Sequence, residues 1–153
     1  MTTTMMACAL TLMLSAKADK HVKFETLPEV VRARVQEKFP KAKVVDAELE
    51  KGRDGKDVYE VKLMVEGAKT EISITPEGTV VSVERIVAWK SAPAEVKKAL
   101  ASSAAKDLKV ERAEEVTEGE AVSWEVTGTG KDGKRVEVVI DAQGGVTVKT
   151  ATE

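Results

Sequence analysis

The sequence predicts an α+β protein made of two tandem αββββ units, each a helix packed on a four-stranded antiparallel sheet. Landmark residues recur at a nearly constant spacing, because Tyr59 and Trp124 differ by 124 − 59 = 65 and the turn glycines Gly78 and Gly144 by 144 − 78 = 66. Each aromatic residue begins a Glu-Val strand, and each glycine closes a hairpin in which a positive φ is needed. The chain therefore reads as a duplication.

Two helices are expected at the starts of the units. The first begins at the capping box Thr26-Leu27-Pro28-Glu29 and ends before Pro40. Its apolar stripe is Leu27, Val31, Val35 and Phe39. The second follows Pro93, with the stripe Ala92, Val96, Leu100 and Ala104.

Strands are predicted from alternating apolar residues. In the first unit these are Val45, Ala47 and Leu49, then Tyr59 to Val65, then Ile72 and Ile74, and last Val80 to Val87. In the second unit they lie near 110–116, 122–126, 135–141 and 145–150. Asp54-Gly55 and Asp132-Gly133 are interpreted as hairpin turns rather than calcium loops, because the regular spacing of oxygen ligands is missing.

Composition excludes several classes of function. The 24 basic and 26 acidic residues nearly balance and form no basic stripe, which argues against a nucleic-acid partner. Cys8 is the only cysteine and His21 the only histidine, so Cys/His metal sites and His-dependent catalytic triads are not expected. We therefore predict no enzyme activity, no catalytic residues, no cofactor and no metal site.

The N-terminal segment has the pattern of an export signal. Met5 to Ser15 is apolar but too short to span a bilayer, and Ala16-Lys17-Ala18 resembles a signal-peptidase site. A buried N-terminal helix or strand is the alternative. The predicted divisions are a signal peptide over 1–18, a leader over 19–25, a first unit over 26–88 and a second over 89–153. The mature protein would be periplasmic or secreted, without membrane attachment.

A candidate partner-binding face follows from strand alternation. Glu60 and Glu125 each follow an aromatic core residue, so their side chains point to the opposite face of the sheet. This helix-free face is a docking surface for a partner or an ordinary solvated face. The seven residues assigned to it are Glu60, Lys62, Glu71, Ser73, Glu125, Thr127 and Glu137.

The motifs resemble the PepSY-like family of exported bacterial domains. The matching elements are Leu27-Pro28, Phe39-Pro40, Tyr59-Glu60-Val61 and Gly78, and the second unit keeps Pro93, Trp124-Glu125-Val126 and Gly144. The tandem also resembles the β-lactamase inhibitory proteins, which present a concave sheet to an enzyme. These resemblances imply two PepSY-like repeats that bind a protein partner in the cell envelope.

Function is accordingly expected to be non-covalent binding. The first hypothesis is an exported, non-enzymatic binding module that inhibits or modulates an envelope or secreted enzyme such as a peptidase. The alternative is a binder of a small ligand or cation in the periplasm, with acidic side chains on the sheet face as donors.

Overall fold

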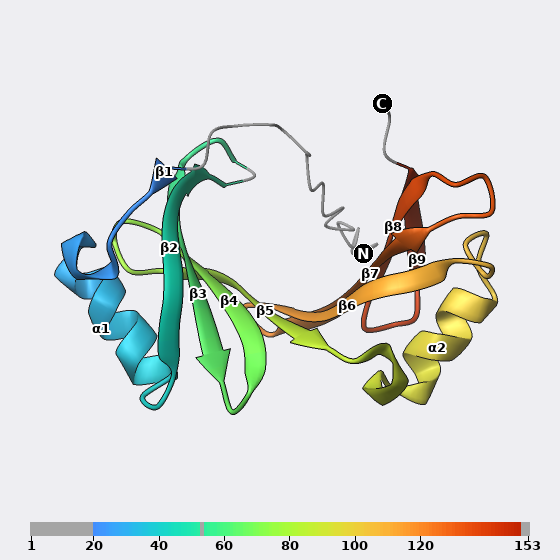
Figure 1. The fold of residues 1–153 in the computed structure, drawn as a ribbon, viewed down its shortest axis with the longest axis horizontal. Helices are drawn as coiled ribbons and strands as arrows, with labels where there is room; N and C mark the ends of the chain where they lie inside the picture. Colours follow the sequence, from blue (N-terminus) through green and yellow to red (C-terminus); the bar gives the residue numbers. More distant parts are fainter. Residues whose placement is uncertain (1–19, 53, 151–153) are drawn as a thin grey trace, which may run out of the picture.

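The strands of the protein form one antiparallel sheet flanked by two helices (Figure 1). The structure is a computed structural model that describes residues 20–52 and 54–150. In this part of the chain the sheet has nine strands, which lie in the order of the sequence. The elements are β1 (Lys20–His21), η1 (Phe24–Thr26), α1 (Glu29–Lys38), β2 (Lys43–Lys51), β3 (Asp57–Val65), β4 (Ala68–Ile74), β5 (Val80–Val87), η2 (Trp89–Ser91), α2 (Ala94–Ala101), β6 (Lys109–Glu118), β7 (Ala121–Thr129), β8 (Arg135–Ile140) and β9 (Val146–Thr150).

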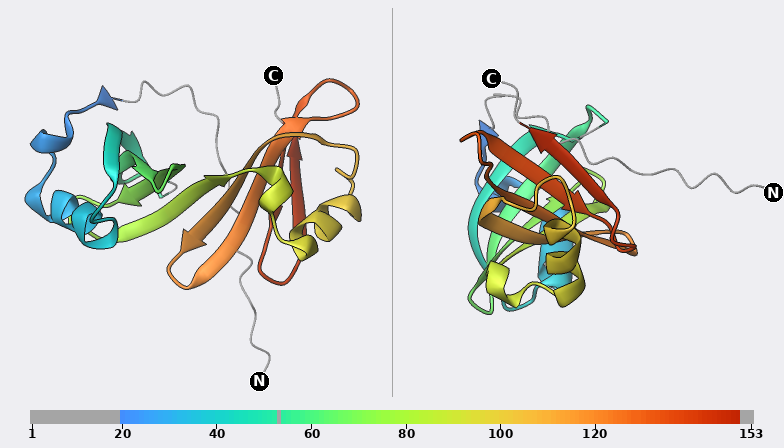
Figure 2. Two further views of the ribbon diagram at one scale, coloured as in Figure 1. Left: turned by 60° about the horizontal axis from the view of Figure 1, so that its bottom comes forward. Right: turned by 90° about the vertical axis from the view of Figure 1, so that its right-hand side faces the viewer.

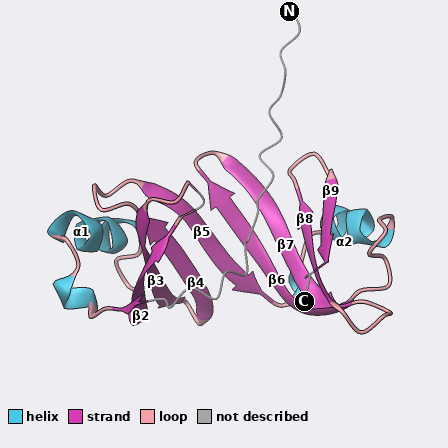
Figure 3. Ribbon diagram, turned by 90° about the horizontal axis from the view of Figure 1, so that it is seen from above, coloured by secondary structure: helices cyan, strands magenta, loops and turns pink. Residues whose placement is uncertain are grey.

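The predicted α+β antiparallel architecture is confirmed, but the strands form a single sheet rather than two. β5 pairs directly with β6, so that Glu84 lies opposite Val116 and Ile86 opposite Glu114. Figure 3 shows the sheet running without a break from one helix to the other. Because β5 would otherwise be an exposed edge strand, this pairing also satisfies its outward-facing backbone groups.

The sheet bends into a trough, with both helices on its outer side (Figures 1 and 2). α1 lies at one end of the sheet and α2 at the other, so neither helix of the described part of the chain covers the inner side (Figure 3). We call this helix-free inner side the concave face. Among the described residues, no helix is both long and apolar enough to span a bilayer.

Each helix covers its own hydrophobic core. Val31 and Val35 of α1 and Val96 and Leu100 of α2 are buried, as their stripes predict. The first core contains Leu27, Val31, Val35, Ala47, Val61, Leu63, Ile72 and Ile74. The second contains Ala92, Val96, Leu100, Trp124, Val126, Val136, Val138 and Ile140. Tyr59 only packs against the first core from a partly buried position, so the two aromatic residues are not equivalent anchors.

The start of α1 differs from the prediction. Residues Phe24–Thr26 form a 3₁₀ turn, and the Thr26 hydroxyl donates to the carbonyl oxygen of Lys23 at 2.7 Å. The N-cap is Pro28, without a side-chain hydrogen bond, so the predicted capping box is wrong. An extended Leu27 separates Thr26 from the helix, which leaves Thr26 too far upstream to cap it.

Two side chains predicted in apolar stripes are exposed. The pairing of β2 with β3 shifts between Val44 and Asp46, and the bulged Val45 is 61% exposed. A bulge adds one residue to a strand, which reverses the side-chain alternation beyond it. Ala104 is also exposed, because α2 already ends at Ala101.

The predicted signal peptide over 1–18 lies outside the described residues. Part of the segment predicted as a leader belongs to the fold, since β1 pairs with β2 and Val22 and Phe24 pack against the first core.

Candidate partner-binding face

In the first half of the chain, the four predicted side chains lie together on the concave face. Lys62 is opposite Glu71, and Glu60 is opposite Ser73, in the pairing of β3 with β4. They alternate with core residues such as Val61, whose side chains point toward α1. The geometry of this cluster therefore agrees with the alternation of the sequence.

In the second half, the three remaining side chains occupy the same face. Thr127 is opposite Glu137 in the pairing of β7 with β8. Glu125 precedes Thr127 by two positions on the same strand and therefore shares its face, while Trp124 and Val126 between them belong to the second core. The structure thus brings all seven predicted residues to one face; their role in binding stays a prediction.

Sequence reasoning missed three carboxylates and one guanidinium on this face. Glu84, Glu114 and Arg112 come from β5 and β6, and Glu48 comes from β2. The pairing of β5 with β6 was not foreseen, although Arg112, Glu114 and Val116 alternate in a way that indicates a shared face.

Glutamates face each other in three cross-strand pairs. Directly opposite residues are Glu48 and Glu60, Glu71 and Glu84, and Glu114 and Glu125. We call these six residues the glutamate strip. Like charges directly opposite each other in a sheet are destabilising. The strip therefore brings together carboxyl groups that repel each other when they are ionised.

Two cations partly compensate the glutamate strip. Lys62 Nζ lies 2.7 Å from Glu48 Oε2 and 3.6 Å from Glu60 Oε1. Arg112 Nη2 contacts Glu114 Oε1 and lies 3.4 Å from Glu71 Oε1. Within residues 20–52 and 54–150, no ion pair reaches Glu84. Compensation is thus weakest near the middle of the sheet.

Burial and crowding raise the pKa of two of these carboxyl groups. Burial raises the pKa of Glu60 from 4.5 to about 7, with a further rise from the charges of Glu50 and Glu71. Burial also raises the pKa of Glu84 from 4.5 to about 8, with added repulsion from Glu125 and Glu114. At neutral pH both groups are therefore protonated for a large fraction of the time.

The face is more buried than an ordinary solvated sheet surface. Glu48 and Glu114 are 6% exposed and Glu125 is 4% exposed. These residues lie on the inner side of the bent sheet (Figure 1), and their side chains have little contact with water. Of the seven residues predicted on this face, Glu125 at least does not belong to an ordinary solvated surface.

Carboxylate oxygens of Glu71, Glu84 and Glu114 lie within 4.8 Å of one another, close enough to share one cation. Arg112 already contacts two of them. His21, Asp46 and Glu48 form a second such group, in which His21 Nδ1 lies 3.1 Å from Asp46 Oδ2. Both groups mark where positive charge is favoured.

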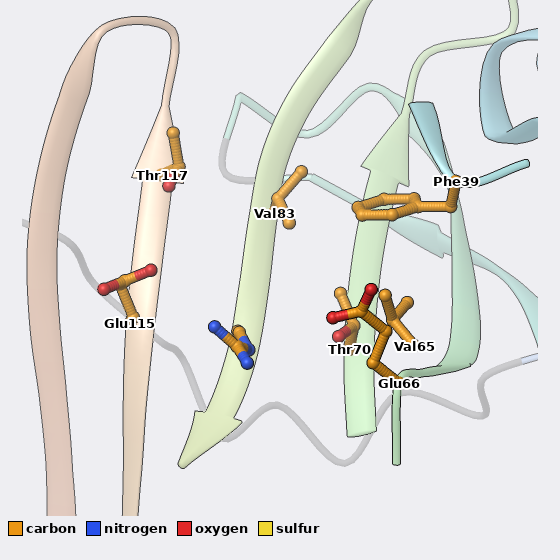
Figure 4. Close-up of a pocket in the computed structure, with 8 residues that line it drawn as sticks. Phe39, Val65, Glu66, Thr70, Val83, Glu115 and Thr117 are labelled. Carbon is orange, nitrogen blue, oxygen red and sulfur yellow. The ribbon is translucent and has the colours of Figure 1, made fainter. Parts of the chain in front are cut away.

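A hollow of about 230 Å³ lies on the other side of the sheet, where Figure 4 shows Glu66 and Glu115 coming from opposite sides. Phe39 and Val83 provide apolar walls. The buried Thr70 hydroxyl on this side has no hydrogen-bond partner among the described residues. Because Thr70 pairs with Leu63 on the core side of the sheet, this hollow is separate from the glutamate strip.

Comparison with known protein families gives a match in the first half of the chain. Residues 28–84 match the PepSY family, described as the peptidase propeptide and YPEB domain. The predicted resemblance to the PepSY family is therefore confirmed over this stretch. No curated protein sequence matches the chain.

Comparison of structures extends the likeness across both halves. A DUF2874 family protein from Bacteroides uniformis has a TM-score of 0.69 at 15% identity, over 80% of this chain and 88% of that one. A BLIP-like protein from Bacteroides fragilis has a TM-score of 0.67 at 15% identity, over 83% and 88%. A protein from Bacteroides eggerthii, provisionally assigned to the periplasm, has a TM-score of 0.66 at 19% identity, over 81% and 88%. The fold is therefore BLIP-like.

Proposed function

We propose that this protein is a non-enzymatic binding module of the cell envelope, and that its concave face docks a protein partner through basic side chains. The observation that carries the proposal is the glutamate strip, in which three pairs of carboxyl groups that repel each other when ionised lie directly opposite on a helix-free surface. An incoming ammonium or guanidinium group would relieve this repulsion, because opposite charge favours the ionised form of a carboxyl group.

The shape of the sheet supports a protein as the partner. A trough without covering helices presents backbone-anchored side chains from many strands at once (Figures 1 and 3). Such rigid positioning lowers the entropy lost on association. The BLIP-like fold and the match to the PepSY family favour an inhibitor or modulator of an envelope or secreted enzyme, such as a peptidase.

A duplication would account for structural features that recur in the two halves of the chain. We propose that 26–88 and 89–153 are tandem repeats, each with one helix and four strands. Strand register supports this, because the bulge that begins at Val44 in β2 recurs at Val110 in β6, 110 − 44 = 66 residues later. Export would rest on a signal peptide over 1–18, which places the mature chain in the periplasm or outside the cell.

The proposal is tested by capture from an envelope extract of the source organism on the immobilised protein. A doubly substituted chain, Glu60→Gln with Glu84→Gln, removes two ionisable carboxyls of the strip while preserving side-chain shape. The matched control is Glu29→Gln with Glu77→Gln, two exposed residues outside the concave face. A stoichiometric protein held by the wild type and the control, but lost by the strip variant, supports the proposal. Equal retention by all three would exclude the strip as the docking site.

A further inference from the structure

A second hollow opens at the end of the second core, on the helix side of the sheet and away from the concave face. It has a volume of about 310 Å³ and lies between the first turn of α2 and the turn that joins β8 to β9. Val96, Trp124 and Ile140 provide an apolar floor, and Glu95, Asp141 and Gln143 contribute polar groups. Trp124 is 8% exposed and lines the hollow.

The corresponding place in the first half is closed. There Gly78 is buried against α1, and a Cβ added to it would lie 2.5 Å from Val30 Cγ2. Arg34 adds a second connection, since its Nε donates to the carbonyl oxygen of Gly78 at 3.2 Å. Helix and hairpin turn are thus packed together without space for a ligand.

The hollow in the second half results from a difference in side chains, because the backbone of the two hairpin turns is alike. The turns match, because Gly78 N donates to Thr75 O at 2.9 Å and Gly144 N donates to Asp141 O at 2.9 Å. Both glycines have positive φ, of 88° and 80°. Yet Gly144 is exposed, and a Cβ added to it would meet no atom within 4 Å.

Two replacements on α2 explain the opening. At a spacing of 95 − 30 = 65, Glu95 stands where α1 has Val30, and its charged side chain does not pack onto the turn. At 99 − 34 = 65, Ala99 stands where α1 has Arg34 and is too short to reach the turn. In the second half, the contacts that join helix and turn in the first half are therefore missing, and a hollow lined by Glu95 and Trp124 lies in their place.

The charged side chains that line this hollow, Glu95 and Asp141, are both acidic, and its lining residues include no basic side chain. Among the described residues, neither Glu95 nor Asp141 forms an ion pair with a lysine or arginine. Asp141 Oδ1 accepts hydrogen bonds from Gln143 N at 2.9 Å and Gly145 N at 2.7 Å, which fixes the carboxylate in place. An aromatic face beside carboxylates favours cations with an apolar surface.

We propose that this hollow, the Trp124 pocket, binds a small organic cation of the quaternary-ammonium class. The methyl groups of such a cation pack on Trp124, Val96 and Ile140, while its positive charge lies near Glu95 and Asp141. A metal ion is a poorer match, since the floor offers carbon rather than oxygen atoms. The pocket does not depend on the concave face, so either site can fail without affecting the other.

The test uses choline and its neutral isostere 3,3-dimethyl-1-butanol as probes. In a Trp89→Phe background, the emission of Trp124 alone reports occupancy of the pocket. We expect a saturable change with choline, and binding of choline at least about threefold tighter than of the neutral isostere. No saturable change up to roughly 100 mM choline, or equal binding of the two probes, would overturn the proposal.

Two substitutions of Glu95 distinguish the contribution of the pocket's shape to binding from the contribution of its negative charge. Glu95→Val recreates the side chain that seals the first half and should abolish binding of both probes. Glu95→Gln keeps the opening and removes the charge, so choline should no longer bind more tightly than the isostere. Because this change is conservative, it tests the role of the charge even if Glu95→Val folds poorly. Glu29→Gln, in the first turn of α1, is the control and should leave binding unchanged. Choline binding that survives Glu95→Gln undiminished would contradict the assigned role of Glu95.

Discussion

Glu71 on β4 and Glu84 on β5 lie directly opposite each other on the concave face, although both carry carboxyl groups. Of the two, only Glu71 forms an ion pair among the described residues, with its Oε1 at 3.4 Å from Arg112 Nη2. Burial, followed by repulsion from neighbouring glutamates such as Glu125 and Glu114, raises the pKa of Glu84 to about 8, so its carboxyl group keeps its proton more readily. A face built in this way responds to pH and to approaching positive charge.

Stability should fall as the pH rises from about 5 to 8.5. The pKa values of Glu60 and Glu84 rise from 4.5 in the unfolded chain to about 7 and about 8 in the folded protein. Between those values the folded state binds more protons than the unfolded state, so raising the pH favours unfolding. We expect a loss of at least about 1.4 kcal/mol, the free energy of one pKa unit, in urea titrations at the two pH values.

Glu84→Gln should remove much of this pH dependence. The amide cannot ionise, so the variant should be more stable than the wild type at pH 8.5 and nearly equal to it at pH 5. The control is Glu29→Gln, an exposed residue outside the strip, which should leave the slope unchanged. A wild-type slope that persists in Glu84→Gln would show that other groups cause it.

Gly78→Ala and Gly144→Ala form a matched pair of substitutions. Both glycines have positive φ, so each alanine should incur the left-handed backbone cost of about 1 to 2 kcal/mol. Only at Gly78 does the new Cβ overlap Val30, at 2.5 Å from its Cγ2. We expect an additional loss of about 1 to 3 kcal/mol there. Thermal unfolding of Gly78→Ala with and without Val30→Ala checks the cause, since the second change should restore part of the stability.

Trp124→Ala should be the most damaging single change in the second core. The ring is 8% exposed and packs with Val96, Val126 and Ile140. Truncation of a large buried aromatic residue costs about 3 to 5 kcal/mol. Tyr59→Ala should cost less, because Tyr59 is only partly buried. Urea titration followed by circular dichroism measures both, and equal losses would contradict the difference in burial.

Most strands and the helical stripes were predictable, because their apolar residues repeat with periods near two and near four. Trp124 and Val126 alternate with Glu125, and that pattern correctly separated the core from the concave face. Val45 shows the limit of this reasoning. A bulge changes the register by one residue, and no local signal in 43–51 indicates where it occurs.

Only part of the candidate site could be predicted from the sequence. Alternation within a strand identified Glu60 and Glu125, but the charge crowding depends on which strands are neighbours. The direct pairing of β5 with β6 places Glu84 beside Glu114 and closes the gap between the two halves. Burial of Glu125 to 4% exposure likewise follows from the bend of the whole sheet, which a pattern along one strand does not contain.

The most direct test of the proposed function is the number of protons released when the captured partner binds. Calorimetric titrations at pH 7 in two buffers of different ionisation enthalpy give this number. If basic side chains of the partner dock on the glutamate strip, Glu60 and Glu84 must ionise, and binding should release roughly one to two protons. The Glu60→Gln, Glu84→Gln variant should release fewer and bind on the order of tenfold more weakly. Unchanged affinity in that variant, with no protons released by the wild type, would contradict docking on the glutamate strip.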